Sequence, residues 1–236
     1  MNLIEKIGGA IVSPRKTFEY LANNPDWKGP FLLMLVSIFL GMGLMIMIFH
    51  NMPTEIGVPR SVLIVGSIGG LVAIAVTCYI GWLIRTALIY LFGSIAKGRA
   101  RFYALFSVVG YAWIPLFIRG LLYTVVFTIK PPVGLLSCGS SSYYAAMSAM
   151  RLPTNLIFFF PSIEHTSPLI ALLSQIDLFL FWGLALMVLG VFFVFRFNLK
   201  KSILIVFSYW VLTIACQTGF LSLMQWLQKV MMNLGG

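Results

Sequence analysis

The sequence predicts an all-α polytopic membrane protein with five transmembrane helices and a short amphipathic cytoplasmic arm at its N-terminus. Hydrophobic residues make up 60% of its 236 residues and charged residues only 9%, whereas soluble domains carry roughly 25% charged residues. Long apolar stretches recur, each close to the about 20 residues that cross a bilayer as a helix. Unbroken runs such as Leu178–Phe195 argue against a β-barrel, whose strands alternate between apolar and polar residues.

The five predicted spans occupy most of the chain. They cover about 31–49, 61–95, 102–129, 169–195 and 202–226. Residues 1–30 form the predicted arm, residues 31–236 the membrane domain, and residues 130–168 a long outer loop. Within the third span, Pro115 removes a backbone hydrogen bond and so predicts a helix kink.

The N-terminal arm is expected to hold two short helices. Apolar residues repeat at helical spacing in the first, at Leu3, Ile4, Ile7 and Ile11. Ser13 and Pro14 mark the start of the second, with a hydroxyl at the N-cap and a proline at the first helical position. This helix, which carries Arg15 and Lys16, either lies flat on anionic headgroups or packs on the cytoplasmic ends of the spans. The sequence leaves both arrangements open.

The basic residues predict the orientation of the chain in the membrane. Ten lie in segments that fall on one side: Lys6, Arg15, Lys16, Lys28, Lys97, Arg99, Arg101, Arg196, Lys200 and Lys201. Four lie on the other: Arg60, Lys130, Arg151 and Lys229. Because basic loops stay in the cytoplasm, we expect a cytoplasmic N-terminus and, after five crossings, an external C-terminus.

Three charged residues fall inside predicted spans: Arg85, Arg119 and Asp177. Arg119 lies roughly 15 Å, and Asp177 roughly 12 Å, from the outer ends of their helices. Because these depths match, we predict an ion pair that either fixes helix register or lines a polar pathway. Exchanging the two charges should then restore the expression lost in either alanine variant. Arg85 is nearer the cytoplasmic side, where it is expected to snorkel.

No catalytic or metal-binding motif accompanies these charges. The outer loop contains Ser140–Ser142, Glu164 and His165, which are residue types used in hydrolysis, but a nucleophile elbow is absent. A membrane hydrolase is therefore an unfavoured alternative, and no enzyme is expected. Neither an H-E-x-x-H nor a C-x-x-C spacing occurs, so no metal or other cofactor is predicted. The net charge of +10 resides in short connections, which is typical of topology signals and not of nucleic-acid binding.

Three segments share a pattern with a known family. They are Ser13-Pro14…Phe18…Pro25-Asp26-Trp27-Lys28-Gly29-Pro30, then Tyr111…Pro115, and finally Asp177-Leu178-Phe179…Trp182 with Gly190. With the spacing of the spans, they resemble the Yip-type (Ypt-interacting protein) family in its compact prokaryotic form. The resemblance implies a five-helix integral protein of a prokaryotic inner (cytoplasmic) membrane with a cytoplasmic N-terminus. Eukaryotic members of that family are associated with Rab-type GTPases and vesicle trafficking.

Two functional hypotheses follow. In the first, a non-enzymatic protein organises the membrane or recruits a membrane or cytoplasmic protein partner. Its basic residues would face anionic headgroups: Arg15, Lys16, Lys97, Arg99, Arg101, Lys200 and Lys201. In the second, a small transporter or channel uses Arg119 and Asp177 as a polar site. A homo-oligomer is compatible with so thin a bundle.

Overall fold

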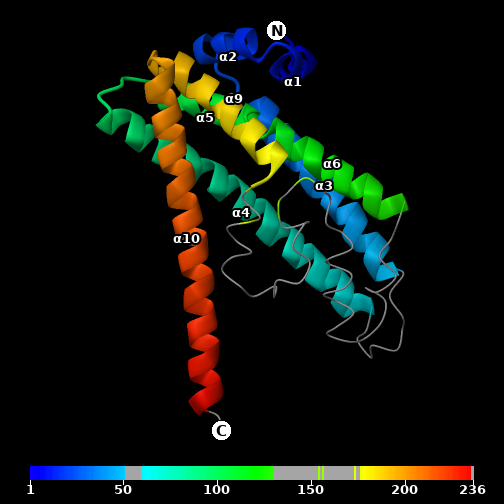
Figure 1. The fold of residues 1–236 in the computed structure, drawn as a ribbon. Coiled ribbons are helices and arrows are strands. Elements are labelled where there is room, and N and C mark those ends of the chain that lie inside the picture. Colours follow the sequence, from blue (N-terminus) through cyan, green and yellow to red (C-terminus); the bar gives the residue numbers. More distant parts are fainter. Residues whose placement is uncertain (51–59, 130–153, 155, 157–172, 174–175, 235–236) are drawn as a thin grey trace.

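Helices dominate the residues that the computed structural model describes, which are 1–50, 60–129, 154, 156, 173 and 176–234 (Figure 1). In chain order they are α1 Leu3–Val12, α2 Pro14–Asn23, α3 Lys28–His50, α4 Arg60–Ile95, α5 Phe102–Tyr111, α6 Ile114–Ile129, α9 Leu178–Phe195 and α10 Leu199–Leu234. Among these residues, the β-type pairing is a single isolated bridge at Asp177. The all-α fold class is confirmed.

Four segments are long and apolar enough to cross a membrane. They are Ile68–Ile95 in α4, Phe102–Val126 through α5 and α6, Leu178–Phe195, which is α9, and Leu199–Met224 in α10. A shorter apolar segment, Lys28–Gly43, lies in α3. The prediction of five spans is therefore supported for four helices, and the span in α3 stays a prediction.

The long outer helices expose apolar side chains. On α4 these include Ile68, Val72, Ile80, Leu83 and Leu91, and on α10 Ile203, Leu204, Phe207 and Val211. Only 17% of the apolar stretch in α4 is buried, and the same share of that in α10, against 50% of the stretch that runs through α5 and α6. Exposing this much apolar surface to water would be unfavourable. We therefore interpret α4 and α10 as lipid-facing helices beside a central α5–α6 segment.

The third predicted span is interrupted. Helix α5 ends at Tyr111 and α6 begins at Ile114, so Pro115 is the second residue of α6. Proline is tolerated in the first turn of a helix, where its missing N–H would have no helical partner. The structure therefore places the bend just before Pro115, at Ala112 and Trp113.

The fourth predicted span begins later than expected. The sequence predicted a helix over 169–195, but α9 starts at Leu178. The backbone N–H of Leu156 donates to the Ile176 carbonyl at 2.9 Å, and that of Leu178 donates to the Thr154 carbonyl at 3.0 Å. These bonds hold the residues before α9 in an extended conformation, so Asp177 precedes the helix. The remainder of the predicted outer loop, 130–168, lies outside the described residues.

The N-terminal helices lie across one end of the bundle (Figure 1). Helix α1 begins with a reciprocal cap, in which the Asn2 side chain accepts from the Glu5 N–H and the Glu5 carboxylate accepts from the Asn2 N–H. Such a cap satisfies two backbone donors that have no helical partner. Helix α2 starts with Pro14 as expected, but the Ser13 hydroxyl makes no cap bond.

Helix α2 packs against α5 and α9. Phe18 and Leu21 on its inner face are fully buried, while Arg15 and Lys16 on its outer face are exposed. Of the two arrangements that the sequence left open, the structure has the one in which α2 covers the ends of other helices.

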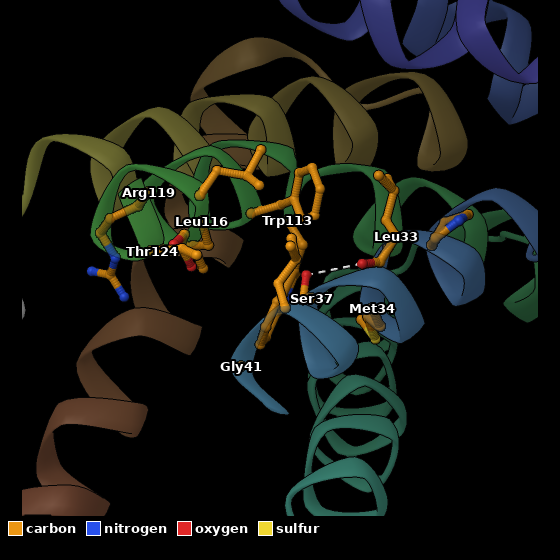
Figure 2. Close-up of a pocket in the computed structure, with 14 residues that line it drawn as sticks. Leu33, Met34, Ser37, Gly41, Trp113, Leu116, Arg119 and Thr124 are labelled. Carbon is orange, nitrogen blue, oxygen red and sulfur yellow. Dashed lines mark hydrogen bonds between the residues drawn. The ribbon is translucent and has the colours of Figure 1, made fainter. Parts of the chain in front are cut away.

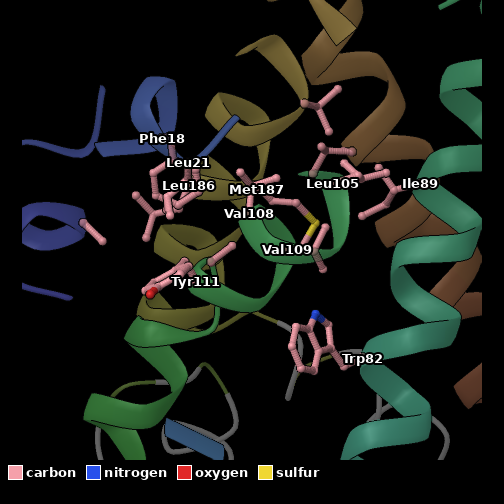
Figure 3. Packing of buried hydrophobic residues seen from close by; sticks show 14 of the residues in the cluster. Phe18, Leu21, Trp82, Ile89, Leu105, Val108, Val109, Tyr111, Leu186 and Met187 are labelled. Carbon is pink, nitrogen blue, oxygen red and sulfur yellow. The ribbon is translucent and has the colours of Figure 1, made fainter. Parts of the chain in front are cut away.

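The hydrophobic core gathers beneath these N-terminal helices (Figure 3). Fully or nearly fully buried side chains come from α2, α4, α5 and α9: Phe18, Leu21, Trp82, Ile89, Leu105, Val108, Val109, Tyr111, Leu186 and Met187. Trp82 stacks on Phe106 with ring centroids 3.8 Å apart and donates from Nε1 to the Phe106 carbonyl at 3.0 Å. The packed core therefore lies at the end of the bundle that carries the N-terminus.

Candidate functional site

Arg119 of α6 and Asp177 before α9 lie side by side. Their closest charged atoms, Nη1 and Oδ2, are 3.4 Å apart. The Asp177 side chain has no exposed surface, whereas 31% of the Arg119 side chain is exposed. The pair therefore joins a buried acceptor to a cation that retains some access to its surroundings.

Asp177 also begins α9. Its Oδ1 accepts hydrogen bonds from the backbone N–H groups of Phe179 at 2.9 Å and Leu180 at 3.1 Å. Its Oδ2 accepts from the Thr154 hydroxyl at 2.9 Å. Both oxygens of the carboxylate thus have partners. Asp177 acts at once as the N-cap of α9 and as the acid of the ion pair. Of the two roles left open by the sequence, these contacts favour the structural one over a polar pathway.

A hollow of about 340 Å³ lies between α3 and the α5–α6 segment (Figure 2). Its lining is mainly apolar, with Arg119 at one edge and Leu33, Met34 and Leu116 among its walls. The hydroxyl of Ser37, which also lines it, donates to the Leu33 carbonyl at 2.9 Å. Because its described lining offers few unpaired polar groups, the hollow gives little support to a transport route through Arg119.

Asp26, between α2 and α3, forms a second polar cluster. Its Oδ2 accepts from Lys6 Nζ at 2.7 Å and from the Tyr111 hydroxyl at 2.9 Å, and its Oδ1 accepts from the Lys28 N–H at 3.0 Å. The Ser107 hydroxyl accepts from the Asp26 N–H and donates to the Asp26 carbonyl, both at 2.9 Å. Asp26 therefore ties α1 and the start of α3 to α5.

Gly29 allows the Tyr111 ring to approach this cluster. A Cβ atom at position 29 would lie 2.6 Å from Cζ of Tyr111 and 2.9 Å from Cδ1 of Leu3. Contacts below 3.0 Å force atoms to move, and Tyr111 is fully buried. Only glycine leaves room here for the tyrosine hydroxyl to reach Asp26.

The acidity of Asp26 gives a testable pH dependence. Burial raises the pKa of its carboxyl, but hydrogen bonds from Lys6 and Tyr111 and the Lys6 charge lower it more, so the pKa lies below 3.8. A depressed folded-state pKa adds stability above the unfolded pKa, and this stability is lost as the pH falls through the folded value. We expect Asp26→Asn to lower the free energy of unfolding by about 1–3 kcal/mol at pH 7. Between pH 5 and pH 3, the thermal midpoint of this variant in detergent should fall less than that of the wild type. Parallel midpoint curves would contradict this assignment.

The turns after α4 and α9 lie at the same end of the bundle as α1 and α2 (Figure 1), and these segments carry many of the basic residues. Arg15 and Lys16 lie on α2, Lys97, Arg99 and Arg101 between α4 and α5, and Arg196, Lys200 and Lys201 between α9 and the first turn of α10. All except Lys201 are exposed. The arm and the two turns that the sequence assigned to anionic lipid, including Arg196 in the turn before α10, therefore lie at one end of the bundle, the basic end.

Three of these arginines line a surface hollow of about 370 Å³. They are Arg99, Arg101 and Arg196, and Asn23 of α2 forms part of the same wall. Lys97 and Arg196 have positive φ angles of 61° and 56° at the ends of α4 and α9, a conformation that favours glycine at helix termini. Cations beside helix C-termini are electrostatically favourable, which offsets part of this backbone strain.

A model of the Yip1 domain family matches residues 8–220. The chain belongs to the Yip1 domain family. Neither a curated protein nor a solved structure matches it significantly. The match includes α2, Asp26 with its partners in α3 and α5, the α5–α6 segment and the Arg119–Asp177 pair. With its apolar helices, this membership makes the Yip1-domain chain an integral membrane protein.

Two basic side chains of this Yip1-domain protein do not lie where the sequence led us to expect them. Lys201 was assigned to the lipid-facing surface, but its ammonium donates to the Ala96 carbonyl at the end of α4 and lies 4.1 Å from the centroid of the Phe197 ring. Arg85 does not extend toward the basic end, where the sequence led us to expect it. Its Nε donates to the Tyr209 hydroxyl at 2.8 Å, and its guanidinium lies 4.4 Å from the centroid of the Trp113 ring.

The sequence reasoning did not single out the Asp26 cluster as a site. The available signal was the position of Asp26 inside the Pro25–Pro30 segment that carried the family resemblance. The hydrolase candidates Ser140–Ser142, Glu164 and His165 lie outside the described residues. Within the described part, no group of three or more His, Cys, Asp or Glu side chains could hold a metal ion.

Proposed function

We propose that this Yip1-domain protein is a non-enzymatic organiser of the membrane, or a recruiter of partners, whose basic end binds anionic headgroups. The observation that supports this proposal is the convergence of exposed cations from α2 and from the turns after α4 and α9. Each Lys or Arg near an anionic bilayer surface contributes about 1 kcal/mol of attraction. Several such residues on a packed end form a surface that a headgroup or an acidic protein partner can bind.

In this proposal the basic end faces the cytoplasm of a prokaryotic cell, and the chain crosses the inner membrane five times. The ten-to-four distribution of basic residues supports that orientation. The fifth crossing requires α3, which runs from Lys28 to His50 and is about 35 Å long at helical rise. A second copy of the chain or a membrane protein could cover the exposed apolar faces. Reporter tags should then place the two termini on opposite sides of the membrane.

Lipid binding at the basic end can be measured by native mass spectrometry of the detergent-solubilised protein. We expect phosphatidylglycerol to be retained in preference to phosphatidylcholine. Replacing Arg99 and Arg101 by glutamine should weaken phosphatidylglycerol retention roughly thirtyfold, since each cation contributes about 1 kcal/mol. A protein partner bound at this end should be lost with the same variant.

A matched control removes two cations from elsewhere in the chain. Arg60 begins α4 and Lys229 lies in the last turns of α10, at the ends of these helices remote from the basic end. The R60Q/K229Q variant has the same net charge as R99Q/R101Q but should retain phosphatidylglycerol at the wild-type level. Equal losses in the two variants would show that overall charge, not the basic end, governs the binding.

A further inference from the structure

A small cavity of about 150 Å³ lies among α4, the α5–α6 break, α9 and α10. Its polar lining consists of Arg85, Trp113, Tyr209, Trp210, Thr213 and Gln217, and Gln217 already has an interaction of its own. Arg85 is ten residues before the end of α4, and Tyr209 is ten residues after the start of α10. Both therefore lie roughly 15 Å along their helices from the basic end, well inside the apolar part of the bundle.

The charge of Arg85 is not balanced by a carboxylate within the described residues. The ion pairs found there are Lys6–Asp26 and Arg119–Asp177. Arg85 has five N–H donors and no acceptor, and its hydrogen bond in the structure uses only Nε, toward Tyr209. The adjacent aromatic faces of Trp113 and Tyr209 attract a cation but carry no negative charge to balance it. A cation at this depth in a membrane protein usually has a partner.

Two further donors line the same cavity. The Nε1 atoms of Trp113 and Trp210 are buried, and neither has a hydrogen-bond partner in the described structure. An indole N–H can only donate, and leaving such a group buried without an acceptor is unfavourable. The Thr213 hydroxyl already donates to the Tyr209 carbonyl at 2.9 Å. Within the described residues, the lining therefore holds two indole donors without an acceptor and one cation without a carboxylate partner.

We propose that this cavity binds an anion, with Arg85 supplying the charge and the two indoles supplying hydrogen bonds. At about 30 Å³ for each water in the liquid, the space holds roughly five water-sized groups, enough for a carboxylate or phosphate but not for a large headgroup. The anion is either a free inorganic ion or the charged group of an amphiphile whose chain lies along the exposed apolar faces. This inference is independent of lipid binding at the basic end.

The experiment is a thermal titration of the whole protein in a neutral detergent and a zwitterionic buffer. Four probes are added separately: sodium chloride, sodium phosphate, oleate, and oleyl alcohol as the uncharged match for oleate. We expect at least one anion to raise the thermal midpoint by roughly 5–10 °C at saturation, and to change tryptophan emission. Oleyl alcohol should do neither. A response to the salts identifies a free ion, and a response to oleate alone identifies an amphiphile.

Variants separate anion binding from a purely structural role of Arg85. Arg85→Met keeps the length of the side chain but removes the charge and the donors, so the anion-dependent shift should disappear. Tyr209→Phe removes the hydrogen-bond partner of Arg85 and leaves all three donor groups, so the shift should persist. If R85M does not fold, Trp210→Phe should still reduce the shift. The proposal is overturned if no anion shifts the wild type, or if R85M responds as the wild type does.

Discussion

Asp177→Ala is expected to destabilise the protein by roughly 4 kcal/mol and to reduce its yield in the membrane. Removing one member of a buried ion pair typically costs about 3–5 kcal/mol because it leaves the other charge uncompensated. The partial exposure of Arg119 reduces that cost. The loss of the cap at the start of α9 adds about 1 kcal/mol, because the N–H groups of Phe179 and Leu180 lose their acceptor. The thermal midpoint in detergent measures the effect.

Substituting Arg119 and substituting Asp177 should cost different amounts of stability. Arg119→Gln leaves the Asp177 carboxylate with the Thr154 hydroxyl and two backbone N–H groups, so it should cost less than Asp177→Ala. Asp177→Asn keeps an oxygen that can cap α9 and should fall between them. Equal costs for R119Q and D177A would contradict the asymmetry.

The structure also changes the expectation for exchanging the two charges. An arginine at position 177 has no acceptor for the N–H groups of α9, so the exchanged variant should remain less stable than wild type even though the two charges face each other. Its failure would therefore not show that the contact is absent. A double-mutant cycle between R119Q and D177N measures the coupling directly.

The sequence predicted the Arg119–Asp177 pair and the bend near Pro115 correctly, but not the reason for the pair. The depth of Asp177 was counted along a helix that in the structure begins only at Leu178. The start of α9 at Leu178 was missed because hydropathy gives no sign of the backbone hydrogen bonds that join Ile176 and Leu178 to Leu156 and Thr154. These bonds flank Asp177, which is in an extended conformation before the helix.

Contacts between distant segments were less accessible to sequence reasoning. Arg85 reaches Tyr209, 124 positions away, and nothing in hydropathy shows that its side chain turns toward α10 instead of the headgroups. Asp26 similarly depends on Ser107 and Tyr111 from α5. Lys201 was counted among exposed cations because its position in a basic turn gives no sign of the Ala96 carbonyl beside it. These contacts are set by the packing of the helices.

Gly110→Ala is expected to destabilise the packed core by up to about 2 kcal/mol. A Cβ atom at this position would lie 2.5 Å from Cβ of Pro30 and 2.6 Å from Cζ2 of Trp82. Neither neighbour moves easily, since the ring of Pro30 is covalently constrained and Trp82 is held by its stacking and hydrogen bond to Phe106. Overpacking of this kind costs about 1–3 kcal/mol, partly offset by the roughly 1 kcal/mol gained on replacing a helical glycine.

Gly120→Ala is the matched control, because it makes the same chemical change in the same candidate span. A Cβ atom at Gly120 meets nothing within 4 Å, so only the gain in helix propensity applies, and the thermal midpoint should stay level or rise. The opposite signs of G110A and G120A would show that α3, α4 and α5 pack closely at Gly110. If G110A is as stable as G120A, Pro30 and Trp82 do not approach Gly110 as closely as in the structure. The packing of α3 against α5 beside Asp26 would then be wrong as well.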